Sequence, residues 1–340
     1  MGVDIQHPNG AKYCIKQQVI KGMTMQLEIL ILEIIVILAA FRIAAEFIAR
    51  AMDDFEDMFG QGFAAGIVLG VINAIPETMV VIIALLASSY DVAIGAALGG
   101  NIVLFSFGIG MVGLVYLKKW KTPLLMKDDY GVEFGFLALS TIIFIVIAIS
   151  DQLNFYIGAI LILLYIAYIF KRYSKAHETF SRNKSNKKAK SNMLRAIIYV
   201  LAGFIIILAF SAPLVSDISQ ISSTIHIPAL WLSLVIVPLV SDFGENINGY
   251  RLAKGRQGGG STAIVSFIGS KLENNTLLLG LICIFAIPYL PIANALPEFL
   301  SIIAVNIIAL LVIRKGKFNY ATSVSLIALY FAVITISLII

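Results

Sequence analysis

A carboxylate stands inside a long apolar segment of this sequence, at Glu77. Pro76, just before it, cannot donate a hydrogen bond to the carbonyl of Ile72 and therefore frees a backbone oxygen beside the carboxylate. Asn73 lies one helical turn before Glu77, on the same face, and adds an amide oxygen. Hard cations such as Ca²⁺ prefer sites made only of oxygen atoms. The segment therefore predicts a cation site inside an apolar helix.

A similar set of residues occurs in a later apolar segment. Ser241 stands one turn before Glu245, with Asp242 between them, which repeats the spacing of the first set. Pro238 is expected to open this helix one turn earlier. A charged side chain at the centre of a membrane-spanning helix costs about 2.5–3.5 kcal/mol on insertion scales, so it indicates function. We interpret Asp242 and Glu245 as further site residues; the alternative is a structural ion bridge to Lys271.

A glycine motif lies between these two sets. Gly95 and Gly99 are four residues apart and permit close contact between helices. Such contact alone is the ordinary explanation for the glycines. It would also place Asn101 at the crossing point of two helices, at membrane depth, where its amide oxygen faces the predicted site.

A near copy of the first motif occurs at Asn294-Ala-Leu-Pro297-Glu298. It follows Pro288 and Pro291, and no glycine motif comes after it. Proline is favoured at the first position of a helix, and an acidic residue there complements the helix dipole. We therefore expect Glu298 to mark the start of a helix, with a site role as the weaker alternative.

The composition places these residues in a membrane. The chain is 59% hydrophobic and 13% charged, with a mean hydropathy of +0.93, whereas soluble domains carry about 25% charged residues. A helix needs about 20 apolar residues to cross a bilayer. Runs of this kind are predicted at 26–50, 62–87, 92–117, 134–150, 155–171, 195–212, 229–252, 262–287, 292–313 and 319–339. The sequence thus predicts an all-α membrane protein with about ten transmembrane helices.

The same composition argues against several other classes of site and partner. Cys14 and Cys283 cannot make a disulfide framework, and the three histidines lie outside the apolar runs. Most basic residues lie in loops between the runs, as membrane topology requires, so nucleic acid is not an expected partner. The expected partners are inorganic cations and the lipid bilayer, with no cofactor and no obligate protein partner.

The longest hydrophilic connector divides the predicted helices into five and five. It runs from Lys171 to Arg195 and holds nine of the 25 Lys and Arg residues. We predict a polar N-terminal extension at 1–25, a first five-helix repeat at 26–171, a basic linker at 172–194 and a second five-helix repeat at 195–340. An odd number of helices per half inverts the second half relative to the first, and inverted repeats hold a site near the bilayer midplane.

The distribution of basic residues predicts the orientation. Lys and Arg gather in the loops after the odd-numbered predicted spans and are nearly absent after spans 2, 4, 6 and 8. By the positive-inside rule the central basic loop is cytoplasmic, and both termini lie outside the cell membrane. Lys12, Lys16 and Lys21 oppose this orientation, so we expect the true start of the protein at Met23 or Met25.

These motifs resemble the cation/Ca²⁺ exchanger superfamily, which includes Na⁺/Ca²⁺ and H⁺/Ca²⁺ antiporters. Its signature has a Pro-Glu in the second helix, followed by Asp-x-Ala-Ile-Gly at the distance that separates Glu77 from Asp91 here, fourteen residues. Gly99-Gly100-Asn101 then stands where Gly-Ser-Asn is expected. The five-plus-five layout with a central basic loop is also similar to the family.

The resemblance implies a ten-helix exchanger in which Glu77 and Glu245 face each other at the centre. It implies that further oxygen atoms near the ion come from Asn73, Ser241, Asn101 and Asp242.

The sequence departs from the family signature in the second half. Gly244 stands where proline is expected, and Lys271 stands where asparagine is expected. A lysine near the site can act as a tethered positive charge that replaces one bound Na⁺, or as a titrating group, since the pKa of lysine falls readily on burial.

We predict an antiporter that exchanges Ca²⁺, or another divalent cation, for Na⁺ by alternating access, with a proton-coupled exchanger as the alternative. A membrane-embedded enzyme would need a nucleophile with its base, or a metal-binding histidine, at membrane depth. The sequence offers neither, so an enzyme is not expected. A non-transporting membrane scaffold is the remaining alternative, and it predicts that Glu77 and Glu245 tolerate leucine.

Overall fold

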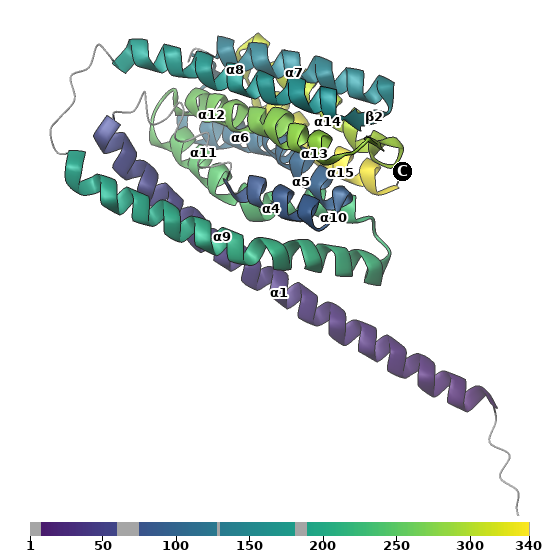
Figure 1. The fold of residues 1–340 in the computed structure, drawn as a ribbon. Coiled ribbons are helices and arrows are strands. Elements are labelled where there is room, and N and C mark those ends of the chain that lie inside the picture. The colour runs from purple at the N-terminus through teal and green to yellow at the C-terminus, as the bar shows by residue number, and fades with distance from the viewer. Residues whose placement is uncertain (1–7, 60–74, 128–129, 181–188, 340) are drawn as a thin grey trace, which may run out of the picture.

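The computed structural model describes residues 8–59, 75–127, 130–180 and 189–339, nearly all of them in helices (Figure 1). The α-helices are α1 (Pro8–Phe59), α4 (Ile75–Leu86), α5 (Tyr90–Ile102), α6 (Ile109–Trp120), α7 (Gly131–Ser150), α8 (Phe155–Phe180), α9 (Ala189–Ile225), α10 (Ala229–Ser241), α11 (Phe243–Gly255), α12 (Gly259–Glu273), α13 (Leu279–Phe285), α14 (Leu296–Lys315) and α15 (Tyr320–Ile339). The π-helical segments η2 (Val103–Gly108) and η3 (Asn274–Leu278), the 3₁₀ turn η4 (Ala293–Ala295) and the strands β1 (Leu124–Leu125), β2 (Gln152–Asn154), β3 (Tyr289–Pro291) and β4 (Lys317–Phe318) complete the set. The predicted all-helical class is confirmed.

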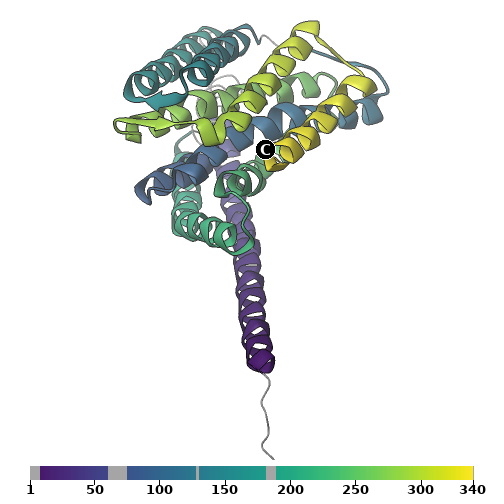
Figure 2. The same ribbon diagram turned by 90° about the vertical axis from the view of Figure 1, so that its right-hand side faces the viewer.

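The helices form an inner bundle between two outer pairs. The long helices α1 and α9 pack against each other on one side, and α7 and α8 lie together on the other (Figure 1). The shorter helices lie between them, and the N-terminal part of α1 extends well beyond the bundle (Figure 2). Because α8 continues to Phe180 and α9 begins at Ala189, helix occupies much of the predicted linker.

The burial of apolar side chains separates inner from outer helices. Helices α5, η2 and α6 together form the segment Tyr90–Trp120, and 94% of its most apolar stretch is buried inside the structure. In Phe155–Ser174 and Met193–Ile225, only 17% and 22% of the most apolar stretch is buried. Large hydrophobic side chains such as Tyr156 and Phe170 are exposed on the outer helices. Soluble proteins rarely expose apolar surface on this scale, so the outer helices face lipid in a multi-pass membrane protein.

The described residues contain six helices that are long and apolar enough to cross a membrane, or seven if the bent pair α10–α11 is one span. Ten were predicted, and four of the predicted spans are not among these six. The span 62–87 is described only from Ile75 onward, as the short apolar helix α4, and the span 229–252 bends by 53° between α10 and α11. The spans 26–50, within α1, and 262–287, in α12, η3 and α13, are the other two. The number ten therefore stays a prediction.

The same sequence of α-helix, π-helical segment and α-helix occurs twice, as α5–η2–α6 and as α12–η3–α13. In each case a hydroxyl donates to the carbonyl four residues before it, Ser106 to Ile102 and Thr276 to Leu272. Such bonds bend helices, and π-helical turns inside α-helices often occur at functional sites. In both cases the π-helical segment directly follows the polar residues of interest, Asn101 in α5 and Lys271 in α12.

A close contact between α5 and α10 depends on glycine. Pro238 has no N–H to donate to the carbonyl of Leu234, which loosens α10 one turn before the bend. A Cβ atom at Gly99 would lie 2.4 Å from that carbonyl oxygen and 2.7 Å from Pro238 Cγ. Gly95 lies equally close to α10. The close helix contact predicted from the glycine spacing is confirmed.

Two pairs of short strands join the ends of distant helices. Strand β1 pairs with β4, so the loops after the predicted spans 3 and 9 lie side by side. Strand β2 pairs with β3, so the loops after the predicted spans 4 and 8 lie side by side. The charge distribution placed the first two loops on one side of the membrane and the second two on the other, and the strand pairs agree with this grouping. Which side is cytoplasmic stays a prediction.

We expect Gly99→Ala to destabilise the protein by about 1–3 kcal/mol, because the added methyl group overlaps a backbone carbonyl that cannot move freely. Thermal unfolding of the purified protein in detergent measures the change. Gly135→Ala is the matched control, since a Cβ atom there meets nothing within 4 Å, and its effect should stay within about 0.5 kcal/mol. Equal stability of the two variants would contradict the close α5–α10 contact.

Candidate cation site

Buried charges from both predicted halves meet at the ammonium group of Lys271. This side chain of α12 is 1% exposed. Its Nζ donates hydrogen bonds to Glu77 Oε2 of α4, at 2.8 Å, and to Asp242 Oδ1 at the α10–α11 bend, at 2.7 Å. Both carboxylates are also buried. The two ion pairs therefore join the first predicted half to the second, deep inside the bundle.

Local backbone features bring the two carboxylates to this point. Glu77 lies in the first turn of α4, where the positive end of the helix dipole favours an acidic side chain. Asp242 is the residue between α10 and α11; its N–H donates to Pro238 O, and its carbonyl accepts from the N–H of Asn246. Pro238 was predicted to open this helix one turn earlier, and the helix bends just after it, at Asp242, whose side chain contacts Lys271.

Three hydroxyl groups connect the carboxyl groups of the cluster to neighbouring helices. Ser241 Oγ donates to Glu77 Oε1 at 3.2 Å. Ser270 Oγ donates to Glu245 Oε2, and Thr78 Oγ1 donates to Glu273 Oε1, each at 2.7 Å. The last of these bonds again joins α4 to α12.

Glu245 lies near the two ion pairs. The family resemblance implied that Glu77 and Glu245 face each other, which stays a prediction; the ammonium of Lys271 pairs Glu77 with Asp242. Glu245 lies within Coulombic range of Lys271 and Glu77, and it forms no ion pair with any residue that the structure describes. Asp242 therefore forms the ion bridge to Lys271 that the alternative interpretation expected. Glu245 forms no such bridge among the described residues.

Several buried polar atoms beside the ion pairs have no hydrogen-bond partner among the described residues. They are Asn101 Oδ1, Asp242 Oδ2, Glu273 Oε2, both amide atoms of Asn274, and Asn275 Nδ2. Asn101 Nδ2 itself donates to Asn275 Oδ1. An unpaired buried polar group is costly, so these atoms concentrate that cost in one part of the bundle.

Gly100 lies against this cluster without a side chain. A Cβ atom there would lie 2.5 Å from Glu77 Oε1, 2.6 Å from Asn274 Nδ2 and 3.0 Å from Asp242 Oδ2. Only glycine lets the α5 backbone approach the two carboxylates this closely. The glycine motif therefore serves both the helix contact and the polar cluster.

The charges of the cluster do not balance. Four carboxyl groups, those of Glu77, Asp242, Glu245 and Glu273, lie around the single ammonium of Lys271. With all of them ionised, the formal sum is −4 + 1, or −3. Charge in a low-dielectric interior must be paired, so the cluster requires additional cations or protons.

The carboxylates are not arranged around a metal ion in this conformation. Within the described part of the chain, no three His, Cys, Asp or Glu side chains form a metal-binding group. The ammonium of Lys271 accounts for this, because it lies between Glu77 and Asp242 and keeps their inner oxygen atoms occupied.

The remaining predicted residues divide into three groups. Ser241, Asp242 and Lys271 lie at Glu77, and Asn101, next to Gly100, donates to Asn275. Asn73 lies outside the described residues. Glu298 begins α14 after Pro297, as expected, and accepts a hydrogen bond from Ser337 rather than joining the cluster.

Sequence reasoning did not assign site roles to Gly100 or to several polar residues of the cluster, namely Thr78, Ser270, Glu273, Asn274 and Asn275. The signal was present in the run Lys271-Leu-Glu-Asn-Asn-Thr276, which is unusually polar for the middle of a predicted span. Without its partners from α4 and α5, this run could not be distinguished from a helix end.

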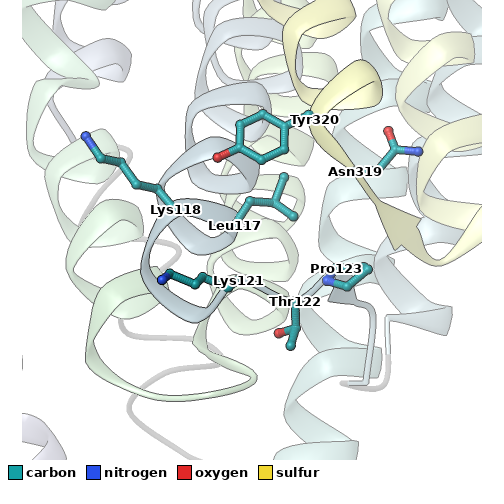
Figure 3. A pocket seen from close by; sticks show the side chains of 7 residues that line it. All are labelled: Leu117, Lys118, Lys121, Thr122, Pro123, Asn319 and Tyr320. Carbon is teal, nitrogen blue, oxygen red and sulfur yellow. The ribbon is translucent and has the colours of Figure 1, made fainter.

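A separate cavity lies at the junction of α6 and α15 and has a volume of about 450 Å³. Figure 3 shows its lining side chains, which include the ammonium groups of Lys118 and Lys121 and no carboxylate. None of the cluster residues lines it. Its positive charge makes it unsuited to a cation.

A family model described as sodium/calcium exchanger protein matches residues 29–173 and 195–339. The chain belongs to this family. The resemblance to the cation/Ca²⁺ exchanger superfamily is confirmed, and the two matched stretches flank the basic segment 174–194. No curated protein sequence matches this exchanger-family chain significantly.

Solved structures with the same fold include those of exchangers. The crystal structure of the H⁺/Ca²⁺ exchanger CAX aligns over 96% of this chain and 92% of its own, with 17% identity and a TM-score of 0.72. The structure of native YfkE aligns over 92% of each chain, with 17% identity and a TM-score of 0.70. The sodium-calcium exchanger NCX_Mj aligns over 91% of this chain and 99% of its own, with 16% identity and a TM-score of 0.64. At such identities the likeness establishes a shared fold.

Replacing Lys271 by methionine should destabilise the cation-free protein by about 3–5 kcal/mol, because it leaves two buried carboxylates without their charge partner. Thermal unfolding in a cation-free buffer measures the loss. Lys254→Met is the matched control, since Lys254 is exposed and its replacement should change stability by less than about 0.5 kcal/mol. A loss no larger than that of the control would show that the buried ion pairs are absent.

Proposed function

We propose that this chain is an antiporter that exchanges Ca²⁺, or another divalent cation, for Na⁺ across the cell membrane. One observation carries the proposal: the buried carboxyl groups of Glu77, Asp242 and Glu273 and the half-buried one of Glu245 gather near the ammonium group of Lys271, beside amide oxygens that have no partner among the described residues. Such a cluster has the oxygen chemistry and the negative charge that a divalent cation requires. Membership of the sodium/calcium exchanger family supports the same reading.

The divalent cation binds between Glu77 and Asp242 in this proposal, with Glu245 as the third carboxylate. Ca²⁺ takes about 6–8 oxygen ligands at ~2.3–2.6 Å, and neutral oxygens are available close by. Asn101 Oδ1 has no partner, and Ser241 Oγ already contacts Glu77. Asn73 would add an oxygen from the undescribed start of the second predicted span.

Competition for the same carboxylates couples the two ion fluxes. When the divalent cation leaves, Na⁺ or protons must neutralise the cluster, because closing the protein over unpaired carboxylates in a low-dielectric interior is costly. In a protein with two inverted halves, access to a midplane site alternates between the two membrane faces. The outer pair α1 and α9, which pack along each other, would move relative to the inner bundle.

Proton coupling is the second candidate, and Glu273 favours it. This buried carboxyl group receives one hydrogen bond, from Thr78, while its Oε2 has no partner among the described residues. A proton on Oε2 would remove the unpaired charge. The H⁺/Ca²⁺ exchanger CAX, which shares the fold, couples to protons as its name states.

In the orientation that we propose for the protein, the central basic loop lies in the cytoplasm and both termini lie outside. The agreement between the strand pairs and the charge distribution supports the alternation of the loops. The positive-inside rule then selects the side.

Glu77→Gln and Glu245→Gln should each lower the apparent affinity for Ca²⁺ by a factor of about 100 to 4,000, because losing one charged partner in a buried site costs ~3–5 kcal/mol and each 1.4 kcal/mol is tenfold. Uptake of Ca²⁺ into proteoliposomes measures the effect. Glu298→Gln is the matched control, since Glu298 is a buried carboxyl group that bonds to Ser337 outside the cluster. Unchanged uptake in the first two variants would rule the site out.

An outward Na⁺ gradient at equal pH should drive Ca²⁺ uptake if Na⁺ is the coupling ion, because the two cations compete for the same carboxylates. The assay uses proteoliposomes whose membrane potential is clamped with potassium and valinomycin. Uptake that follows a pH gradient in Na⁺-free medium, and that is lost in Glu273→Gln, would instead identify protons as the coupling ion.

A further inference from the structure

The ammonium of Lys271 occupies the place that a bound cation would take between Glu77 and Asp242. Its two hydrogen bonds, at 2.8 and 2.7 Å, use one oxygen atom of each carboxylate. All three side chains are almost completely buried. A metal ion that is coordinated by the same oxygen atoms cannot bind while the ammonium is present.

We propose that Lys271 is a tethered competitor of the transported cation. Its ammonium pairs with Glu77 and Asp242 when the site holds no ion and offsets one of their two negative charges, and it must leave them before a divalent cation binds. The inference rests on the proposed function, because it takes these two carboxylates as the ion site. It accounts for the finding that no metal-binding group of acidic side chains is formed among the described residues in this conformation.

The cluster contains an acceptor for the displaced ammonium. Asn274 lies three residues after Lys271, at the start of η3, and residues three apart share one face of a helix. Its Oδ1 is buried and has no partner among the described residues. The ammonium can therefore leave the carboxylates and still donate a hydrogen bond inside the cluster. The π-helical segment η3, which contains Asn274, is the part of the helix that would adjust.

A competing charge on the protein itself has opposite effects on the affinity for the divalent cation and on the rate of the transport cycle. It weakens the apparent affinity for the divalent cation, because part of the binding free energy is spent on displacing the ammonium. It also speeds the return of the protein without a divalent cation, because Lys271 pairs with two carboxylates that would otherwise be closed over without any charge partner. A lysine with a structural role alone would not separate these two effects.

The test compares wild type with Lys271→Met and Lys271→Gln, as purified full-length protein. Binding of Ca²⁺ is measured by isothermal titration calorimetry in Na⁺-free buffer. The affinity should rise about tenfold or more in both variants, since two charge-assisted hydrogen bonds no longer oppose binding. Lys271→Arg, which keeps the positive charge, should stay near wild type, and Lys254→Met should match wild type.

Transport supplies the second measurement. Exchange of Ca²⁺ for Ca²⁺ does not require the site to change its membrane orientation without bound Ca²⁺. Net Ca²⁺ flux does require this return step. In Lys271→Met and Lys271→Gln, the KM for Ca²⁺ should fall, and net flux should decrease relative to Ca²⁺/Ca²⁺ exchange. If the methionine variant does not fold, the glutamine variant alone decides, because its amide keeps a hydrogen-bond donor in the cluster.

The outcomes separate this inference from the proposed function. If the wild type binds Ca²⁺ and the folded variants bind it with unchanged or weaker affinity, the competitor role is overturned. The proposed exchange function would still stand. Absence of Ca²⁺ binding and transport in wild type itself would overturn both. Higher affinity together with an unchanged ratio of net flux to exchange would also overturn the inference, since the ammonium would then have no part in the return step.

Discussion

The buried ammonium group of Lys271 between Glu77 and Asp242 is the interaction on which the arrangement of the inner helices depends. Removing three charges from water is so costly that they persist only when they are paired with good geometry and further hydrogen bonds. That condition fixes α12 against α4 and against the α10–α11 bend, and hence the second predicted half against the first. The hydroxyls of Ser241, Ser270 and Thr78 complete the pairing by binding the carboxyl groups that the ammonium leaves partly free.

The breaks in the inner helices follow from the same need. In a bilayer each backbone polar group must find a partner inside the protein, so irregular backbone is tolerated only where it is buried in protein or lines a cavity. The π-helical segments η2 and η3 lie in the interior, and the bend after Pro238 places the buried side chain of Asp242 there. The outer helices, by contrast, expose apolar side chains such as Ile149, Tyr156 and Phe170 to lipid.

The position of Lys271 gives this family member a feature that its motifs alone do not explain. A positive charge stands inside a cluster whose carboxyl groups suit cations, so the protein carries its own ligand for the site. The backbone at Gly100 approaches the same carboxylates from the other side, and the unpaired amide of Asn274 lies one turn further along the helix. In the proposed mechanism, binding, release and the change of orientation are therefore linked through one side chain and the short π-helical segment that follows it.

The sequence by itself determined the membrane class, the family and most of the outer helices, because the hydrophobic thickness of the bilayer sets the length of an apolar run regardless of its neighbours. It also identified Glu77, Asp242 and Lys271 as residues of interest, because charge is rare and costly in such runs. Only the tertiary structure decided which carboxylates the ammonium contacts, since Glu77 and Lys271 are 194 residues apart in the chain. Which groups meet depends on where α4, α12 and the bent pair α10–α11 cross, and helix crossings follow from the packing of whole surfaces rather than from the spacing of residues within one helix.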